Sequence, residues 1–523
     1  MKNYIKYIGI LALGLVACEP EFENPVTEEG FYTSGEANFS NYVALGNSLT
    51  AGYADNALYL TGQINSYPNI LAQQFAKVGG GEFTQPLVAD NAGGLLLNGQ
   101  QITSNRLVLA MTPEGPAPMI YTGDEPSTEV SDILTGPFNN MGVPGAKSFH
   151  LLAPGYGNIA GVATGMSNPY FVRFASSPNA TILEDALAQD PTFFSLWIGN
   201  NDVLSYAVSG GTGVNQTGNL DPTTYGSNDI TDPQVFASVY SQLVSALAAD
   251  DTEGVLLNIP DVTSVPFFTT VPNNALVLDA ATAAQLTAYF RAVAGIFAQG
   301  LIMQGIPPEQ AQALASQYAI VFNEGNNRFL IDVPPSPGNP LGFRQMTEEG
   351  LLLFTINTGA LAQGYGSVML TPEVMQVLGI LQAGGQPTPE QAQLVLNAVS
   401  GIDDADALST AELENINTAR TAFNQTIQAV AEANGLAYVD TASFLTELAN
   451  GGIAFDAGVL TSAYVTGGAF SLEGIHLTPR GYALVANKII EAINETYGAS
   501  VPKVNIGTYG TITPYGEVGT YLE

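Results

Sequence analysis

Two short segments, far apart in the chain, carry the residue types that nucleophilic catalysis needs. In the first, "YVALGNSLTAG" at 42–52, an apolar run gives way to small and polar residues around Ser48. A serine hydroxyl is a useful nucleophile only when a base accepts its proton and fixed donors stabilise the developing oxyanion. The simpler alternative is that Ser48 only caps a helix after a strand, which serine often does.

The choice of base is narrow because the chain has only two histidines, His150 and His476. His476 lies in "SLEGIHLTPRGY", with Glu473 three residues upstream. At that spacing on one loop, a carboxylate can turn back to hold the imidazole N–H and fix its tautomer. We therefore expect His476 to be the base and Glu473 its partner. His150, in "AKSFHLLAPGYG", is expected to be a hydrogen-bonded structural histidine, with a place in the cleft as the alternative.

The elements around these segments predict an α/β protein. Runs rich in β-branched and aromatic residues suggest buried parallel strands, and helical patterns alternate with them; the runs lie at 41–46, 191–199, 253–260 and 435–440. The clearest helix follows a capping box of Ser409 and Glu412 and ends before Gly435. This alternation predicts a three-layer α/β/α sandwich with a mostly parallel sheet. Sites in such sheets form at the carboxyl ends of strands, beside the topological switch point.

We place the α/β domain at residues 39–500. Two stretches within it have no place in a minimal domain of this class. Residues at about 56–138 are rich in Gly, Pro and Thr, and helical segments interrupt the strand rhythm over about 265–408. We interpret both as insertions. Their apolar residues are expected to pack on the sheet, with a roof over a cleft as the alternative. Residues 501–523 form a C-terminal tail without an assigned role.

Four motifs in the chain resemble the sequence blocks of the GDSL, or SGNH, hydrolases: "GNSLTAG" at 46–52, "NMGVPGAKS" at 140–148, "IGNND" at 198–202 and "EGIHLTPRGY" at 473–482. The resemblance implies an SGNH-type, flavodoxin-like sandwich that cleaves carboxylic esters without a cofactor or metal. It also implies roles: Ser48 as nucleophile, His476 as base, and the Ser48 N–H, the Gly145 N–H and the Asn201 side-chain amide as oxyanion donors.

The sequence departs from that pattern at two positions. Asn47 stands where the family has the aspartate of its name, and this neighbour of the nucleophile is not the base. Glu473 stands in place of an aspartate, so its side chain is one methylene longer; a backbone carbonyl that orients the histidine is the alternative. A second Gly-x-Asn-Asp, at 226–229, lies in a polar run and is expected to be a loop. The chain has no Gly-x-Ser-x-Gly elbow, which argues against the α/β-hydrolase fold.

Composition excludes one class of partner. Acidic residues outnumber basic ones 47 to 13, which gives the 523-residue chain a net charge of -34. A nucleic-acid backbone would be repelled by such a chain. No His, Cys and carboxylate pattern has metal-ligand spacing and no Walker-type loop is present, so the sequence implies no cofactor and no metal.

The N-terminus predicts export and membrane attachment. Lys2 and Lys6 precede the short apolar run "IGILALGLVA", which ends at Cys18, the only cysteine. The segment "LVAC" resembles a bacterial lipoprotein box, in which Cys18 would be lipidated; an ordinary cleaved signal peptide is the alternative. Residues 19–38 are expected to be an acidic, flexible tether. The tether is similar to the signal that sends some Bacteroidetes lipoproteins to the cell surface, so we expect the cell envelope, with the outer membrane favoured.

Together these features predict a lipid-anchored serine hydrolase that acts on an ester of a lipid or of an acylated carbohydrate. The alternative is a catalytically inactive surface lipoprotein that binds glycan or lipid in the same cleft. The oligomeric state is not indicated by the sequence.

Overall fold

A parallel sheet of five strands forms the centre of the protein, which was analysed as a computed structural model that describes residues 31–113, 115–361 and 364–515. Its strands are β1 (Tyr42–Gly46), β7 (Asn140–Gly142), β8 (Phe193–Trp197), β9 (Glu253–Leu257) and β19 (Ala437–Val439). They lie in the order β7-β1-β8-β9-β19, and every neighbouring pair is parallel. In chain order this is 2-1-3-4-5, the flavodoxin-like arrangement, whose switch point lies beside the first strand.

Helices cover both faces of this sheet, as expected for a parallel sheet buried on both sides. On one face, α4 (Tyr67–Phe75) packs against α17 (Pro479–Tyr497). The other face carries α6 (Ile182–Leu187), α8 (Pro233–Leu247) and α15 (Thr410–Asn434), and α7 (Asn201–Val208) packs on α15. The three-layer α/β sandwich predicted from the sequence is therefore confirmed.

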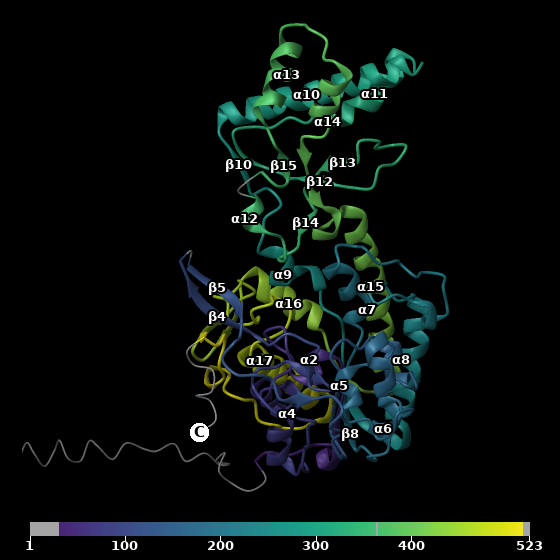
Figure 1. The fold of residues 1–523 in the computed structure, drawn as a ribbon. Coiled ribbons are helices and arrows are strands. Elements are labelled where there is room, and N and C mark those ends of the chain that lie inside the picture. The colour runs from purple at the N-terminus through teal and green to yellow at the C-terminus, as the bar shows by residue number, and fades with distance from the viewer. Residues whose placement is uncertain (1–30, 114, 362–363, 516–523) are drawn as a thin grey trace, which may run out of the picture.

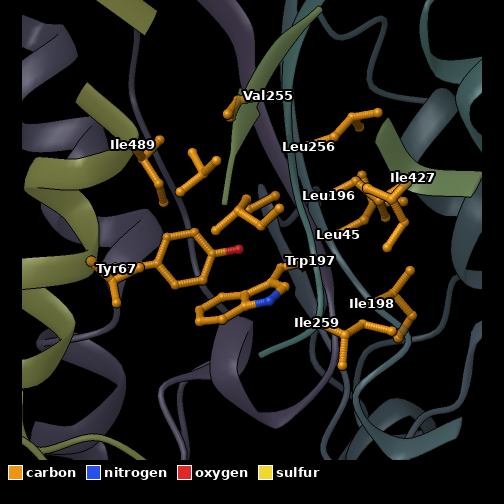
Figure 2. Close-up of a cluster of buried hydrophobic side chains, with 14 of the residues drawn as sticks. Leu45, Tyr67, Leu196, Trp197, Ile198, Val255, Leu256, Ile259, Ile427 and Ile489 are labelled. Atoms are coloured by element: carbon orange, nitrogen blue, oxygen red, sulfur yellow. The ribbon is translucent and has the colours of Figure 1, made fainter. Parts of the chain in front are cut away.

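In the core, strand side chains point alternately to the two helical layers and pack against helix side chains (Figure 2). Tyr67 of α4 and Ile489 of α17 lie on the same side as Trp197, whose ring is 5.6 Å from that of Tyr67. Leu45 and Ile427 lie on the opposite side of the sheet (Figure 2). All five side chains are almost completely buried, so the strands that carry the site are fixed from both faces.

Helix α4 changes the interpretation of residues 56–138. The Gly- and Pro-rich composition led us to treat the whole segment as an insertion, yet Tyr67, Ile70 and Phe75 of α4 belong to the main core. This helix lies between β1 and β7 in the chain and belongs to one of the two helical layers, so the insertion begins after it. The additions comprise a three-stranded sheet and a hairpin: β2 (Leu95–Leu97), β3 (Gln100–Gln101) and β6 (Thr128–Glu129), then β4 (Leu107–Thr112) with β5 (Gly115–Ile120).

Residues 271–408 form a lobe that projects from one end of the sandwich (Figure 1). Four helices lie at its tip: α10 (Ala280–Met303), α11 (Pro308–Ala315), α13 (Pro372–Gln382) and α14 (Pro389–Leu396). Short strands and the short helix α12 (Thr358–Leu361) lie between the tip and the sandwich; the strands are β10 (Leu276–Leu278), β11 (Gly325–Asn327), β12 (Leu330–Asp332), β13 (Phe343–Gln345), β14 (Leu351–Leu352), β15 (Ser367–Val368), β16 (Val399–Ser400), β17 (Ile402–Asp403) and β18 (Ala407–Leu408). By length and composition α10 would also suit a membrane span, but here it packs against α11, α13 and α14.

The lobe has hydrophobic clusters of its own, one around Tyr289 and Phe290 and one around Phe329 and Ile331. Most of its apolar side chains therefore pack within the lobe. The expectation from the sequence, that they would pack on the sheet, is wrong for this segment. The reason is size, since a segment this long contains enough apolar residues for a separate core. The junction is shared, because Leu353 and the short helix α9 (Pro266–Thr269) contribute to the main core.

The remaining α-helices and strands are short. They are α2 (Ser48–Ala51), α3 (Leu60–Ile64), α5 (Pro169–Val172), α16 (Thr441–Asn450), β20 (Ile453–Phe455) and β21 (Gly458–Leu460). Two of them frame the motifs: α2 directly follows β1, and β21 precedes the loop that leads into α17.

Both ends of the described chain are tied to α17. The Thr33 N–H donates to Ser500 Oγ at 2.8 Å and the Glu36 N–H to the Tyr497 carbonyl at 2.8 Å, so the predicted flexible tether does not extend through residue 38. In the tail, Val501 and Ile506 are buried in the main core. The predicted signal peptide and Cys18 lie outside the described residues.

Candidate active site

Ser48 is the first residue of α2, immediately beyond the carboxyl end of β1. The cap of that helix is Asn47, whose side-chain oxygen accepts the Leu49 N–H at 3.0 Å. The helix-cap alternative for Ser48 is therefore wrong. The strand ends at Gly46, where a Cβ would lie 2.5 Å from the Trp197 carbonyl oxygen, so only glycine permits this close turn into α2.

His476 and Glu473 lie on one tight loop between β21 and α17. Glu473 Oε1 accepts the His476 backbone N–H at 2.7 Å and lies 2.8 Å from Nδ1 of the same residue. Gly474, between them, has a φ of +77° and approaches Phe267 so closely that a Cβ would lie 2.8 Å from its backbone nitrogen. The extra methylene of the glutamate is taken up by this turn, and the predicted contact with His476 is present.

The loop and the helix meet at the nucleophile candidate, where His476 Nε2 lies 2.7 Å from Ser48 Oγ. Ser48 is 7 % exposed, and the side chains of His476 and Glu473 are 12 % and 10 % exposed. When Nδ1–H donates to the carboxylate, Nε2 keeps its lone pair and can accept the serine proton. The three residues thus form the hydrogen-bonded series of a serine, a histidine and an acid.

The environment keeps Glu473 ionised. Burial alone would raise the pKa of Glu473, but the hydrogen bond and charge of His476 and the hydroxyl of Ser471 outweigh it, so the net pKa is lowered. The second carboxylate oxygen, Oε2, accepts the Ser471 hydroxyl at 2.7 Å and the Asn56 N–H at 3.0 Å. A charged carboxylate fixed in this way can stabilise the imidazolium that forms when a histidine beside it takes a proton from a nucleophile.

The predicted oxyanion donors are brought to the same strand ends. The Asn201 side-chain amide, at the start of α7 after β8, donates to the Ala146 carbonyl at 2.9 Å and has a second N–H available. A further hydrogen bond, from Asn47 Nδ2 to Asn200 Oδ1 at 3.3 Å, joins the residue before Ser48 to the residue before Asn201. The motifs at β1, β7 and β8 therefore form one continuous network.

Gly145 lies in the loop after β7 with a φ of +81°, a conformation that favours glycine. The loop is held by Asn168, whose amide donates to the Pro144 carbonyl at 2.7 Å. Within residues 31–113, 115–361 and 364–515, neither the Gly145 N–H nor the Ser48 N–H donates a hydrogen bond to another protein group. Both are therefore available to a ligand oxygen.

The motif that contains Asn201 also carries an anchor. Asp202 is fully buried and accepts both the N–H and the hydroxyl of Ser148, at 2.9 and 2.6 Å. Burial raises the pKa of Asp202, and the Ser148 hydrogen bonds and the Lys147 charge oppose that rise. This carboxylate fastens the "IGNND" turn to the end of the "NMGVPGAKS" loop and so fixes the relative position of the two donor segments.

Neither His150 nor the second Gly-x-Asn-Asp belongs to the series of Ser48, His476 and Glu473, although both contact Lys147 of the 140–148 motif. His150 Nδ1 accepts the Lys147 N–H at 3.0 Å and its ring stacks on Tyr156, while burial and the Lys147 charge lower its pKa to about 4. It is the structural histidine that the sequence favoured. Asp229 of the second Gly-x-Asn-Asp closes its own loop by accepting the N–H groups of Val214 and Gly226.

One buried carboxylate near the site was missed by the sequence analysis. Asp55, in the turn after α2, accepts the Leu472 N–H at 3.1 Å, and its own N–H donates to Ser471 at 3.2 Å. The signal available in the sequence was the pair Asp55-Asn56, which is typical of a tight turn. No local pattern indicates that the turn contacts residues more than 400 positions away.

In the described part of the chain, no group of three or more His, Cys, Asp and Glu side chains is placed to hold a metal ion. Comparison with protein-family models, with curated proteins and with solved structures finds no match to this chain. The functional assignment therefore relies on the four motifs and on the geometry above.

Proposed function

We propose that the protein is a serine hydrolase that cleaves carboxylic esters through an acyl-enzyme. The observation that supports this most strongly is the series from Ser48 Oγ to His476 Nε2 at 2.7 Å and from His476 Nδ1 to Glu473 Oε1 at 2.8 Å. A structural role for these side chains would not require a hydroxyl, an imidazole and an ionised carboxylate in that order.

In the proposed cycle, Ser48 Oγ attacks the ester carbonyl while His476 Nε2 takes the hydroxyl proton. Negative charge then develops on the carbonyl oxygen, within reach of the N–H groups of Ser48 and Gly145 and the amide of Asn201. The tetrahedral intermediate collapses and the imidazolium returns the proton to the leaving alcohol. A water molecule, activated by the same imidazole, then releases the acid and restores the serine.

The substrate class is an ester of a lipid or of an acylated carbohydrate. Apolar insertions that roofed the cleft would favour a lipid-like acyl group. That argument weakens here, since the apolar side chains of the 271–408 lobe mostly fill its own clusters. A short acyl group and a long one are therefore both included in the test below.

The competing function is a lipoprotein that binds glycan or lipid without turnover, and one reason for it is that Glu473 stands in place of the family's aspartate. The 2.8 Å contact between Glu473 and His476 removes that reason. Non-catalytic binding is the function that a negative result in the experiment below would favour.

The test is hydrolysis of p-nitrophenyl esters, from acetate to palmitate, by the full-length protein in detergent. Ser48→Ala should abolish turnover, while Ser245→Ala, at an exposed serine on α8, should leave it unchanged. Absence of turnover on every ester by folded protein, or equal turnover by Ser48→Ala, would favour the binding function.

The cell-envelope location is part of the same proposal and concerns Cys18, outside the described residues. Lipidation at Cys18 would anchor the folded body through the segment that precedes Thr33. Cells fed a clickable fatty acid should label the wild-type protein but not Cys18→Ser, and the variant should move to the soluble fraction. Equal labelling of the two would contradict a lipid anchor at this residue.

A further inference from the structure

A strained turn packs against the back of Glu473. Asp55 and Asn56 have φ values of 52° and 64°, two consecutive non-glycine residues in the left-handed region. The turn is closed by hydrogen bonds between Ala54 and Ala57 in both directions, at 3.1 and 3.0 Å. Two central residues with positive φ are typical of a type I′ turn, in which Asp and Asn are tolerated. Such backbone persists only where surrounding contacts hold it.

Those contacts reach the acid of the candidate triad directly. The Asn56 N–H and the Ser471 hydroxyl both donate to Glu473 Oε2, the oxygen that does not face His476. The Asp55 N–H donates to Ser471 Oγ at 3.2 Å, and Asp55 Oδ1 accepts the Leu472 N–H at 3.1 Å. Three hydrogen bonds thus join the turn to the loop that carries Glu473, and the fourth, from Ser471 to Glu473, lies within that loop.

The other side of Asp55 is held as firmly. Oδ2 accepts the Tyr59 hydroxyl at 2.9 Å and lies 3.9 Å from Nη1 of Arg106, whose guanidinium covers the Tyr59 ring at 4.4 Å. Asp55 and Arg106 are only 4 % and 3 % exposed. A carboxylate buried beside a second carboxylate is unfavourable unless it is paired, which is why these partners are needed.

The same turn belongs to the segment that carries the nucleophile. Asp55 follows Ser48 by seven residues, and the Tyr53 N–H donates to the Ser48 carbonyl at 3.0 Å. The Tyr53 ring lies 4.7 Å from the imidazole of His476. A shift at Asp55 would therefore move the serine segment and the histidine loop relative to each other.

We propose that Asp55 is a positioning residue for the Ser48, His476 and Glu473 series. It touches no reacting atom in the proposed cycle and acts through Asn56, Ser471 and Leu472. It locks the turn after α2 to the acid loop so that Glu473 Oε1 faces His476 Nδ1. The inference depends on the proposed esterase function for its kinetic readout only.

The test compares Asp55→Asn with Asp90→Asn in the full-length protein in detergent. Asparagine keeps the size of Asp55 and tolerates the left-handed conformation, so Asp55→Asn should fold. Asp90 is a matched control: its carboxylate accepts the N–H groups of Ala92 and Gly93 and makes no contact with residues 471–476. We expect Asp55→Asn to lower kcat for p-nitrophenyl acetate by about 10²-fold without a change in KM, and Asp90→Asn to change neither.

A second readout needs no turnover. Because the chain has only two histidines, ¹⁵N-histidine labelling gives four ring nitrogens, and His476→Asn identifies those of His476. Asp55→Asn should move the His476 signals away from the Nδ1-protonated tautomer, while Asp90→Asn should leave them in place. Unchanged His476 signals in Asp55→Asn would overturn the inference, as would equal losses of kcat in both variants together with equal losses of Tm. If the wild type neither turns over esters nor reacts with a fluorophosphonate, the proposed function fails, and the histidine signals still decide the role of Asp55.

Discussion

Glu473 Oε1 accepts two hydrogen bonds from one residue, the backbone N–H of His476 at 2.7 Å and its Nδ1 at 2.8 Å. The carboxylate therefore sets both the backbone position of the histidine and the direction of its ring. A glutamate does this across three residues because the loop turns at Gly474, where φ is +77°. The longer side chain is matched to this turn.

Removing the charge of Glu473 should disable the histidine. Glu473→Gln places an amide N–H donor or a neutral oxygen against Nδ1, so the imidazolium loses its partner and the wrong tautomer becomes populated. We expect kcat to fall by roughly 10⁴-fold, measured with p-nitrophenyl acetate. Glu473→Asp keeps the charge but has a shorter side chain, so its kcat should lie between those of the wild type and of Glu473→Gln. Wild-type kcat in Glu473→Gln would show that a backbone carbonyl orients His476 instead.

Loss of the Asn201 amide should affect the transition state more than binding. Asn201→Ala removes one proposed oxyanion donor and also the hydrogen bond to the Ala146 carbonyl. We expect kcat to fall by about 10²-fold to 10³-fold with a much smaller change in KM. A loss that appears in KM alone would instead assign Asn201 to substrate binding, and the thermal midpoint of the variant separates either result from misfolding.

The pH dependence of stability should report Asp55. Burial and then the charge of Glu473 raise the pKa of Asp55 from 3.8 to about 6, against the Leu472 N–H, the Tyr59 hydroxyl and Arg106. A carboxyl with a raised pKa binds its proton more tightly in the folded state than in the unfolded state. Its contribution to the free energy of unfolding is therefore most favourable below pH 3.8 and is lost as pH rises through 6.

Urea unfolding of the wild type and of Asp55→Asn between pH 4 and pH 7 isolates this effect, since the other groups titrate in both proteins. The free energy of unfolding of the wild type, relative to the variant, should fall by about 2 kcal/mol as pH rises across that window. A difference that does not vary with pH would mean that Asp55 has an ordinary pKa in the folded protein.

A core substitution in the 271–408 lobe should unfold the lobe and leave the candidate site intact. Phe290 is completely buried in the cluster at the tip of the lobe, and it is not part of the main core. Phe290→Ala should destabilise the lobe by about 3 to 5 kcal/mol, seen as faster proteolysis within 271–408. Hydrolysis of p-nitrophenyl acetate should persist, and a parallel loss of both would show that the lobe and the sandwich unfold together.

The sequence predicted much of the central fold, because parallel strands and capped helices have strong local signals. Ser48 and His476 were found since each lies in a short motif at the end of an element. Asp55 was missed because its partners, Ser471 and Leu472, lie more than 400 residues away. Helix α4 was assigned to an insertion because its nine residues lie in a segment rich in Gly, Pro and Thr, and only packing against α17 shows its place in the core.

The most direct test of the central claim is to locate a covalent adduct. The full-length protein is treated with a fluorophosphonate, digested and mapped by mass spectrometry, beside His476→Ala. We predict a single adduct, on Ser48, that is absent or greatly slowed in His476→Ala because the hydroxyl then lacks its base. Folded wild-type protein that stays unlabelled at Ser48, or labelling of Ser48 at the same rate in both proteins, would contradict the assignment of Ser48 as an activated nucleophile.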